Sequence, residues 1–333
     1  MITPDLNQKS ANIADPVLKV SNLAVSFGRG RYLAVRGLDF DLNQGEVVGL
    51  VGESGSGKSM TAFSLMGLLP FGAALDSGSV IFQGRELTTL PPKERRSVCG
   101  LHMGMVFQEP LTALNPVLTI GDQVSEIFRY RMGYSKAQAQ KMAIELLGQA
   151  GLPNPASTLK NYPHRFSGGM RQRVVIAMAL ALSPQLVIAD EPTTALDPTI
   201  AAQVVLILKT MSEQRQTAVL FITHNLRLLT GLTSRVLVMY AGLIVEETKG
   251  DFSDPLHPYT RGLMNALPPL PSSGQSKRLA PIAGHPLSPD ERLNGCPFEP
   301  RCPERLGVCA TVCPPLTEKS GYGRVRCHLY YHA

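Results

Sequence analysis

Residues 52–59 combine glycines, serines and a single lysine in a spacing that could hold the phosphates of a nucleotide. Their sequence, Gly-Glu-Ser-Gly-Ser-Gly-Lys-Ser, fits the pattern G-x-x-x-x-G-K-[ST]. Glycines let the main chain curl around phosphates, Lys58 brings positive charge to the β- and γ-phosphates, and the Ser59 hydroxyl can coordinate Mg²⁺. We therefore predict that the chain binds ATP or GTP. The predicted nucleotide contacts are Gly52, Glu53, Ser54, Gly55, Ser56, Gly57, Lys58, Ser59 and Met60.

The segments on either side of this loop favour the same interpretation. Residues 47–51 are apolar enough for a strand buried on both faces, and residues 60–69 have the pattern of a helix. A phosphate-binding loop requires this order of strand, turn and helix. The alternative is a glycine-rich turn without a ligand, and the combination of spacing and context disfavours it.

A second chemical feature is an acidic pair at the end of an apolar run. Residues 186–189 predict a buried strand, which Asp190 and Glu191 follow directly. Asp190 is suited to hold Mg²⁺ through water, and Glu191 to polarise an attacking water. Without a nucleotide, the same pair would be an ordinary loop start or helix cap.

A third feature opens an alanine-rich stretch that continues to Leu182. Ser167, Gly168 and Gly169 stand at its start. Ser167 can serve simply as a helix N-cap. A helix N-terminus with free N–H groups and no side chains at two positions can also form a second phosphate-binding surface.

These segments give nearly the whole chain a close resemblance to the ATP-binding subunits of ABC transporters. Residues 166–173 resemble the ABC signature, residues 195–197 the D-loop, Gln108 the Q-loop and His224 the switch histidine, in the family's order. Phe27 falls where the family has an aromatic side chain that stacks on adenine, although an inward-facing strand residue is the simpler alternative.

The resemblance implies a shared catalytic site between two ATPase domains that meet head to tail. Ser167, Gly168 and Gly169 of one domain would face the nucleotide of the other, so that ATP closes the dimer and hydrolysis reopens it. Gln108 would touch Mg²⁺ or the attacking water, and His224 would contact the γ-phosphate. The Mg²⁺ ligands implied are Ser59, Gln108 and Asp190, and the catalytic residues are Glu191, His224 and Gln108.

The resemblance also implies partners and a location. The partners are a second ATPase subunit, which we expect to be a paralogue, two membrane-spanning permease subunits and an extracytoplasmic solute-binding protein. The chain would lie peripherally on the cytoplasmic face of the inner (plasma) membrane.

Composition excludes other classes. The 32 basic residues form no block of five or six and the net charge is only +6, so we expect no nucleic-acid groove. No apolar stretch approaches the roughly 18 residues that span a bilayer, so other chains must supply a pore. Residues 1–16 contain acids and lack an apolar core, so we expect no signal peptide.

The chain's pattern predicts an α/β fold, and the resemblance implies a P-loop NTPase core of the ABC type. Residues 17–42 alternate around a turn at residues 28–31, like an antiparallel β segment. Later apolar strands interleave with helices as in a mostly parallel sheet. A helical stripe predicts a helical signature subdomain over about 109–182. We expect an ATPase domain at 1–254 and an irregular C-terminal extension at 255–333.

The C-terminal extension indicates which group of ABC transporter ATPases the chain resembles. Residues 255–261 and the proline- and serine-rich connector at 268–276 resemble the C-terminal extension of ATPases from dipeptide, oligopeptide and nickel importers. His257 is expected to cap or pack rather than to catalyse.

Five of the six cysteines lie in this extension. Disulfides are disfavoured if the chain stays in a reducing cytoplasm. Thiolates can bind zinc, but this tail lacks the paired C-x-x-C motifs typical of zinc sites. Thiolates can also bind a [4Fe–4S] cluster, and the tail resembles the cluster-binding tails of that importer group. By resemblance the ligands are Cys296, Cys302, Cys309 and Cys327. Cys313 could replace Cys309 or stay free, and purely structural cysteines are the alternative, which is our expectation for Cys99.

We therefore predict an ATP-hydrolysing subunit that powers import of peptides or a related small solute. The main alternative is a soluble ABC ATPase acting on nucleic acid or ribosomes, which would need a coiled-coil insert or a second ATPase domain. A P-loop kinase or GTPase is disfavoured by the signature and the switch histidine. The sequence does not identify the solute.

Overall fold

The structure is a computed structural model that describes residues 15–28, 32–194, 196–250, 252, 254–267, 280–287, 291 and 294–331. Three segments named above lie outside the described residues: most of the N-terminal segment, Ala195 of the D-loop and the connector at 268–276.

A central sheet of eight strands runs through the molecule in the order β11-β12-β10-β9-β3-β8-β7-β6. Its parallel part confirms the predicted α/β core, since β6, β7, β8, β3 and β9 pair in parallel. These strands span Met103–Val106, Leu186–Asp190, Ala218–Thr223, Val47–Val51 and Arg235–Tyr240. Their apolar runs form strands because both faces of this sheet are covered, and every residue of β3, β7 and β8 is buried.

A second, antiparallel sheet has the order β2-β1-β4-β5, with β1 at Leu18–Phe27, β2 at Tyr32–Leu42, β4 at Ala73–Phe82 and β5 at Arg85–Glu86. Pairing of Phe27 with Tyr32 closes the predicted hairpin of β1 and β2. Strand β4 was not predicted, because its middle, residues 76–79, is polar and contains Gly78. It forms because β1 offers its other edge as a template.

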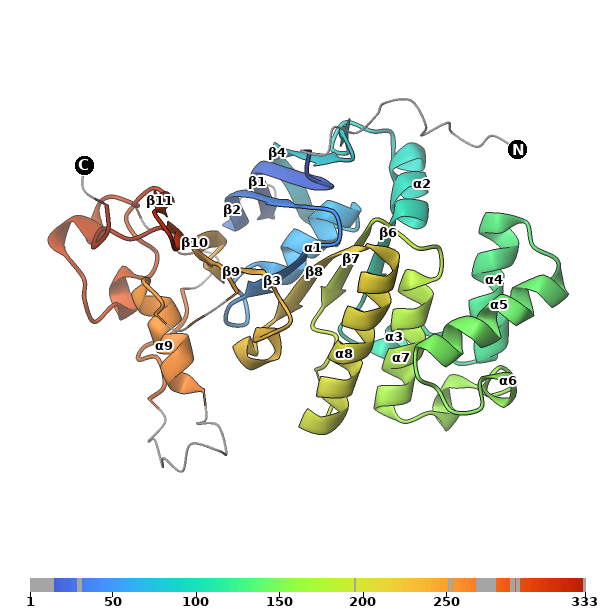
Figure 1. Ribbon diagram of the computed structural model, residues 1–333. Coiled ribbons are helices and arrows are strands. Elements are labelled where there is room, and N and C mark those ends of the chain that lie inside the picture. The colour runs from blue at the N-terminus through green and yellow to red at the C-terminus, as the bar shows by residue number, and fades with distance from the viewer. Residues whose placement is uncertain are drawn as a thin grey trace.

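Helices cover the central sheet, and several follow one another in the range where we predict a helical subdomain. Figure 1 shows α4, α5 and α6 at one end of the molecule and α9 with β11 at the other. Local signals account for several ends: Ser135 and Gln138 make a capping box at the start of α5, and Gly133 ends α4 with a left-handed residue. The helices are α1 Lys58–Met66, α2 Pro92–His102, α3 Pro110–Ala113, α4 Ile120–Met132, α5 Lys136–Gln149, α6 Pro155–Thr158, α7 Gly168–Leu180, α8 Pro198–Arg215 and α9 Pro258–Ala266.

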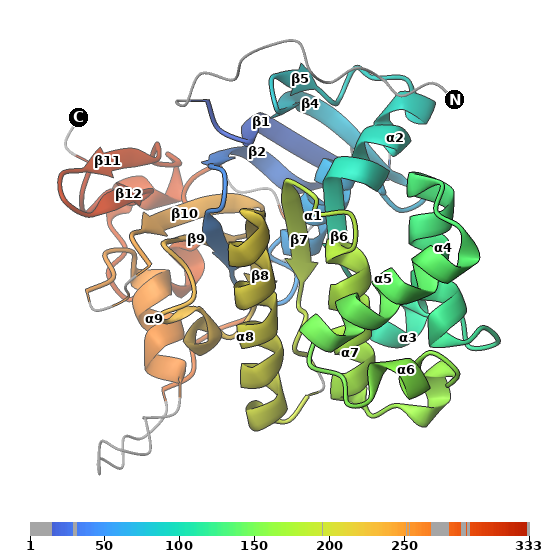
Figure 2. The same cartoon turned by 45° about the vertical axis from the view of Figure 1, so that its right-hand side comes forward.

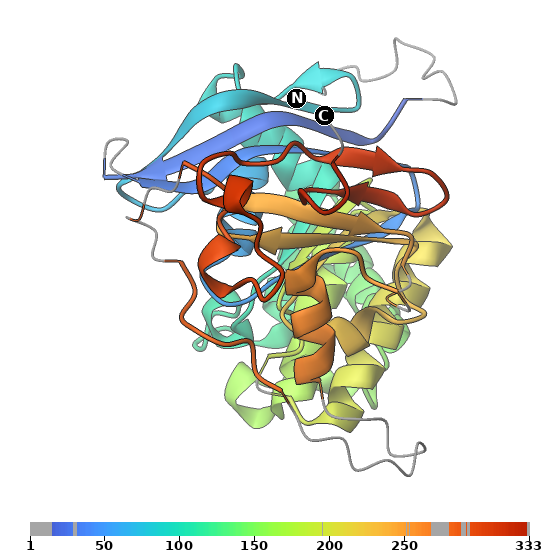
Figure 3. The same cartoon turned by 90° about the vertical axis from the view of Figure 1, so that its left-hand side faces the viewer.

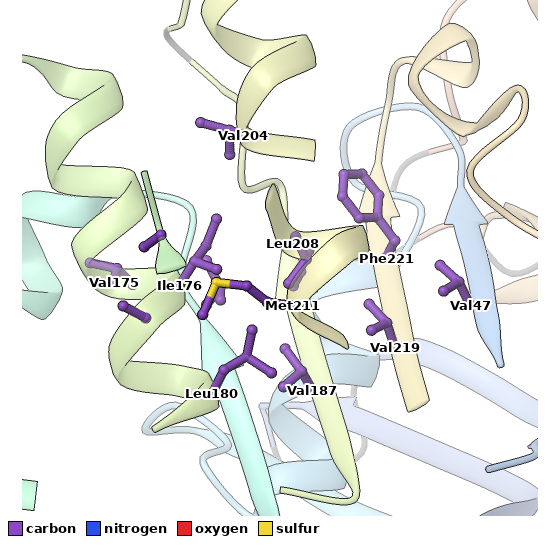
Figure 4. Close-up of a cluster of buried hydrophobic side chains, with 14 of the residues drawn as sticks. Val47, Val175, Ile176, Leu180, Val187, Val204, Leu208, Met211, Val219 and Phe221 are labelled. Carbon is purple, nitrogen blue, oxygen red and sulfur yellow. The ribbon is translucent and has the colours of Figure 1, made fainter. Parts of the chain in front are cut away.

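Alternate residues of the parallel strands enter two separate cores. On one face Val219 and Phe221 of β8 pack against α7 and α8 (Figure 4). On the other face Leu220 and Ile222 pack against α1 and the antiparallel sheet, which lies above the central sheet in Figure 2. The parallel strands are thus held between two apolar layers, which fixes the positions of their ends.

The C-terminal extension is less irregular than predicted. After α9 it forms 3₁₀ turns and a hairpin, β11 at Thr317–Lys319 and β12 at Gly323–Val325, which joins the central sheet beside β10 at Leu243–Thr248 (Figure 3). Three-residue strands of polar composition leave no periodic signal in a sequence, and they form here because β10 presents a free edge.

Candidate nucleotide site

The predicted phosphate loop connects β3 to α1 and borders a cavity of about 880 Å³. Two of its glycines are required by close approach of the main chain. A Cβ at Gly52 would lie 2.1 Å from the Met239 carbonyl oxygen, and one at Gly57, where φ is +105°, would lie 2.4 Å from the Ala34 carbonyl oxygen. The loop is therefore held against two strands, with its open side toward the cavity.

Lys58 is buried, with 5% of its surface exposed, and its Nζ donates to the carbonyl oxygens of Gly52 and Glu53 at 2.9 Å each. Burial lowers the pKa of this ammonium, while Glu191, Asp190 and Glu53 oppose the shift. The side chain is thus curled back over the loop at the position where phosphate oxygens would compete for it.

Oxygen ligands suited to Mg²⁺ meet beside the loop. The Ser59 hydroxyl donates to Asp190 Oδ1 at 3.2 Å. Burial raises the pKa of Asp190, and the hydrogen bond from Ser59 partly offsets that rise. A hydroxyl and a desolvated carboxylate in contact fit a hard divalent cation, which prefers oxygen ligands and would favour the ionised carboxylate.

The three predicted catalytic residues converge on one oxygen. Glu191 Oε2 accepts from Thr194 Oγ1 at 2.7 Å and Gln108 Nε2 at 3.4 Å, and lies 3.1 Å from His224 Nδ1. Burial would raise the pKa of Glu191, but the bonds from Thr194 and His224 outweigh it and lower the pKa. Glu191 is therefore ionised near neutrality, as a residue that accepts a proton from water must be.

The backbone of Glu191 is also unusual. Its φ of +47° is left-handed, a conformation rare for a residue with a side chain, and its N–H donates to the Ile222 carbonyl oxygen at 2.9 Å. This turn follows the end of β7, and Glu191 lines the cavity.

Part of the cavity lining is apolar. Phe27 and Tyr32 stack with ring centroids 5.6 Å apart, and both line the cavity together with Leu33. Sequence analysis named Phe27 but missed Tyr32, whose signal was its position directly across the predicted hairpin turn. It also missed Leu263 and Leu287 of the extension, which line the same cavity.

Comparison with known proteins agrees with this geometry. Residues 35–194 match the family model described as ABC transporter, and residues 245–309 match that described as oligopeptide/dipeptide transporter, C-terminal region. The chain is 46% identical over 320 residues to the dipeptide transport ATP-binding protein DppD of Bacillus subtilis, covering 95% of each. It belongs to the ABC transporter family.

Two further similarities give the same family. The chain is 44% identical over 317 residues to the oligopeptide transport ATP-binding protein OppD of Salmonella typhimurium, covering 94% of this chain and 93% of that one. A solved dimer of the ATP-binding cassette MJ0796 with ADP and phosphate superposes with a TM-score of 0.63 at 28% identity, covering 70% of this chain and 99% of that one. The chain is accordingly an ATPase of the ABC type.

The signature of this ABC ATPase lies away from its own cavity. Ser167 caps α7, its hydroxyl accepting from the Met170 N–H at 3.3 Å, and both Ser167 and Gly168 are exposed. Gly169 is buried against Ile200, where a Cβ would lie 2.4 Å from Ile200 Cγ2. None of the three lines the described part of the cavity.

The five cysteines of the extension are free thiols within its folded part. The Cys296 N–H donates to the Cys309 carbonyl oxygen at 2.8 Å. Burial raises the pKa of Cys296 to about 12 and of Cys327 to about 11. Across the part of the chain that the structure describes, no three cysteine, histidine or acidic side chains lie close enough together to hold a metal ion. As they lie, the thiols therefore do not fit the predicted metal site.

Among the described residues, no helix combines the length and apolar character needed to span a bilayer.

Proposed function

We propose that this chain hydrolyses ATP to drive the import of peptides, or a chemically related small solute, through a membrane ABC transporter. The observation that carries the proposal is the meeting of Gln108, Thr194 and His224 at the Glu191 carboxylate, within the cavity that the phosphate loop borders. Relatives named for dipeptide and oligopeptide transport match over nearly the whole chain, extension included, which disfavours the soluble ATPase acting on nucleic acid or ribosomes.

In the proposed mechanism the loop binds the triphosphate while the acidic pair serves hydrolysis. Lys58 would exchange its contacts with the loop carbonyls for phosphate oxygens. Ser59, Gln108 and Asp190 would hold Mg²⁺, which neutralises charge on the phosphates when bound. Glu191 would accept a proton from the attacking water, and His224 would help to orient that water or the γ-phosphate. Phe27 would stack on adenine, and Tyr32 would support it from behind.

The exposed signature supports a second ATPase subunit as partner. Ser167 and Gly168 present N–H groups at the start of α7, a favourable position for an anion, but they lie outside the chain's own cavity. They would complete the nucleotide site of a second subunit, which we propose is a paralogue. Closure would then depend on the γ-phosphate that hydrolysis removes.

A groove in the helical subdomain supports permease partners. It measures about 680 Å³ and lies among β6, α4 and α7, with Met105, Phe107 and Tyr130 in its lining. Tyr130 is 77% exposed, so a partner could reach it in this lining. We propose that two permease subunits dock at such grooves, with an extracytoplasmic binding protein beyond them. The chain would then sit on the cytoplasmic face of the membrane.

The finer proposals on the extension depend on resemblance. We propose a boundary after residue 254 and a [4Fe–4S] cluster on Cys296, Cys302, Cys309 and Cys327, with Zn²⁺ as the alternative metal. The thiols influence one another electrostatically, as a set gathered in one region would, and Cys296 and Cys309 are joined through their main chains. Binding would require the side chains to turn toward one another, since they do not now enclose a metal.

Transport can be tested directly. The full chain would be assembled with its co-purifying membrane subunits in proteoliposomes that enclose labelled di- and oligopeptides or free amino acids. We expect peptide movement and peptide-stimulated ATP hydrolysis, both lost in the same assembly that carries Lys58→Ala. ATP hydrolysis that responds to none of these solutes, or continues unchanged in the Lys58→Ala assembly, would refute the proposal.

A further inference from the structure

The C-terminal extension holds the phosphate loop at Glu53, where it contacts both the side chain and the main chain. Arg301 Nη1 and Nη2 donate to the two Glu53 carboxylate oxygens at 2.6 and 3.1 Å. The Glu53 N–H donates to the Tyr259 hydroxyl at 2.8 Å. A loop that must present its N–H groups to phosphates is thus fixed from outside by residues more than two hundred positions later in the chain.

Arg301 is held firmly enough to act in this way. Its side chain is only 4% exposed. The guanidinium lies over the rings of Tyr240 and Phe298, at 5.8 and 6.0 Å from their centroids, and its Nε donates to the Ala283 carbonyl oxygen at 3.0 Å. A buried arginine that already contacts two aromatic rings and a carbonyl oxygen loses little further freedom on pairing, so its two donors can fix the carboxylate geometry.

Glu53 in turn contacts Lys58, the residue expected to bind the phosphates. The carbonyl oxygen of Glu53 accepts from Lys58 Nζ at 2.9 Å, so any rotation of Glu53 moves a ligand of the lysine. Tyr259 is fully buried and cannot follow such a rotation. In addition, Leu263 and Leu287 bring the extension to the wall of the cavity itself.

Charge gives the contact a second consequence. Glu53 places a carboxylate beside a cavity that receives a highly anionic triphosphate. Unneutralised, it would repel the ligand, and in a partly desolvated site the repulsion would not be fully screened. Arg301 supplies the opposite charge without entering the cavity, because it does not belong to the described lining.

We propose that Arg301 and Tyr259 are positioning residues for ATP binding, through which the extension fixes Glu53 and neutralises its charge. The extension is therefore part of the nucleotide site and contributes to ATP affinity. The inference concerns nucleotide affinity, so it does not depend on which solute is transported or on a metal at the cysteines.

A merely structural role must be separated from this one, because other contacts also attach the extension. Arg326 Nε donates to the Ile244 carbonyl oxygen and its Nη1 to the Pro314 carbonyl oxygen, both at 3.0 Å. Arg326 anchors the extension at the far edge of the sheet and does not touch the phosphate loop. Arg326→Gln is therefore the matched control for Arg301→Gln.

The experiment measures Mg-ATP affinity of the full chain by titration calorimetry, with unfolding temperature recorded for each variant. We expect Arg301→Gln to weaken ATP affinity roughly tenfold, as the loss of one charge-assisted contact does. Arg301→Lys should fall between, because it restores the charge but not the two-pronged geometry. Tyr259→Phe should weaken affinity by a smaller factor, and Arg326→Gln should not weaken it beyond about twofold.

A double variant tests the charge argument. Adding Glu53→Gln to Arg301→Gln removes the unpaired carboxylate and should restore part of the lost affinity. Equal losses in Arg301→Gln and Arg326→Gln at matched unfolding temperatures would reduce Arg301 to an attachment residue. Unchanged affinity in Arg301→Gln, or no recovery in the double variant, would likewise overturn the proposal.

Discussion

The ATPase core and the C-terminal extension are held together by different interactions. In the core, parallel strands such as β3 and β8 bury every residue between two apolar layers. The extension instead attaches through a few aromatic rings and hydrogen-bonded charges, with strands of three residues each. The core can thus specify its fold by local pattern, whereas the extension needs the finished core as a template.

The attachment has two main components. Phe298 contacts the rings of Tyr240, Tyr259 and His257, with centroids 5.3 to 5.8 Å apart. Nearby, the fully buried Glu246 of β10 accepts from the Tyr322 hydroxyl and the Leu256 N–H, both at 2.6 Å. Burial raises the pKa of Glu246, and hydrogen bonds such as that from Tyr322 offset part of the rise. Such a buried polar contact is specific, because its loss leaves a desolvated group without a partner.

The largest expected effect belongs to the core alone. Glu191→Gln keeps the shape of the side chain but removes the base, so we expect turnover of the assembled transporter to fall by roughly 10²- to 10⁴-fold with ATP affinity retained. ATP hydrolysis and nucleotide binding would be measured together. Glu213→Gln, on an exposed part of α8, is the control. Turnover within about threefold of the unaltered chain would remove Glu191 from the mechanism.

The next effect belongs to the extension. If the cysteines hold a [4Fe–4S] cluster, anaerobically purified protein should contain about four iron and four sulfide per chain. Serine at Cys296, Cys302 or Cys327 should lose iron and loosen the extension, whereas Cys99→Ser, in the core, should retain the iron. Separate serine variants of Cys309 and Cys313 would identify the fourth ligand. Stoichiometric zinc without iron or sulfide, or no metal at all, would contradict the cluster.

The smallest expected effect is a loss of stability in the extension, and not in the core, when the pH is lowered. His257 is 2% exposed, its Nδ1 accepts from the Tyr259 N–H at 3.0 Å, and burial together with the charge of Arg261 lowers its pKa from 6.5 to about 3. The folded state therefore binds fewer protons than the unfolded state between these values. The stabilisation is complete above pH 6.5 and is lost as pH falls toward 3. At pH 5.5 the loss is on the order of 1 kcal/mol.

Protection factors from hydrogen exchange at pH 7.5 and 5.5 would detect this loss. Those of α9 and the 3₁₀ turns should fall more at pH 5.5 than those of β3 and β8. The variant His257→Asn keeps an acceptor at the helix N-cap but cannot titrate in this range, so its extension should respond much less to pH. An identical pH response in that variant would assign the effect to other groups.

The sequence predicted what is local in this molecule. The phosphate loop, the acidic pair and the switch histidine each follow an apolar run, and parallel strands bring such ends to one edge, so their meeting could be expected. Strand β4, Tyr32 and the hairpin β11–β12 were missed because their structure depends on a partner strand. Arg301 and Tyr259 were missed for a stronger reason, since nothing near them in the sequence indicates that they contact Glu53.

The pair of Glu53 and Arg301 also has a consequence for the order in which the protein matures. It joins residues 248 positions apart in the chain. A ribosome adds about 5–20 residues per second, so it needs roughly 12 to 50 seconds after making the loop to deliver this arginine. During that interval the loop carries a carboxylate without its partner. A nascent chain that has not yet reached Arg301 would therefore hold ATP poorly, and full affinity would arise only after this arginine has been made and has paired with Glu53.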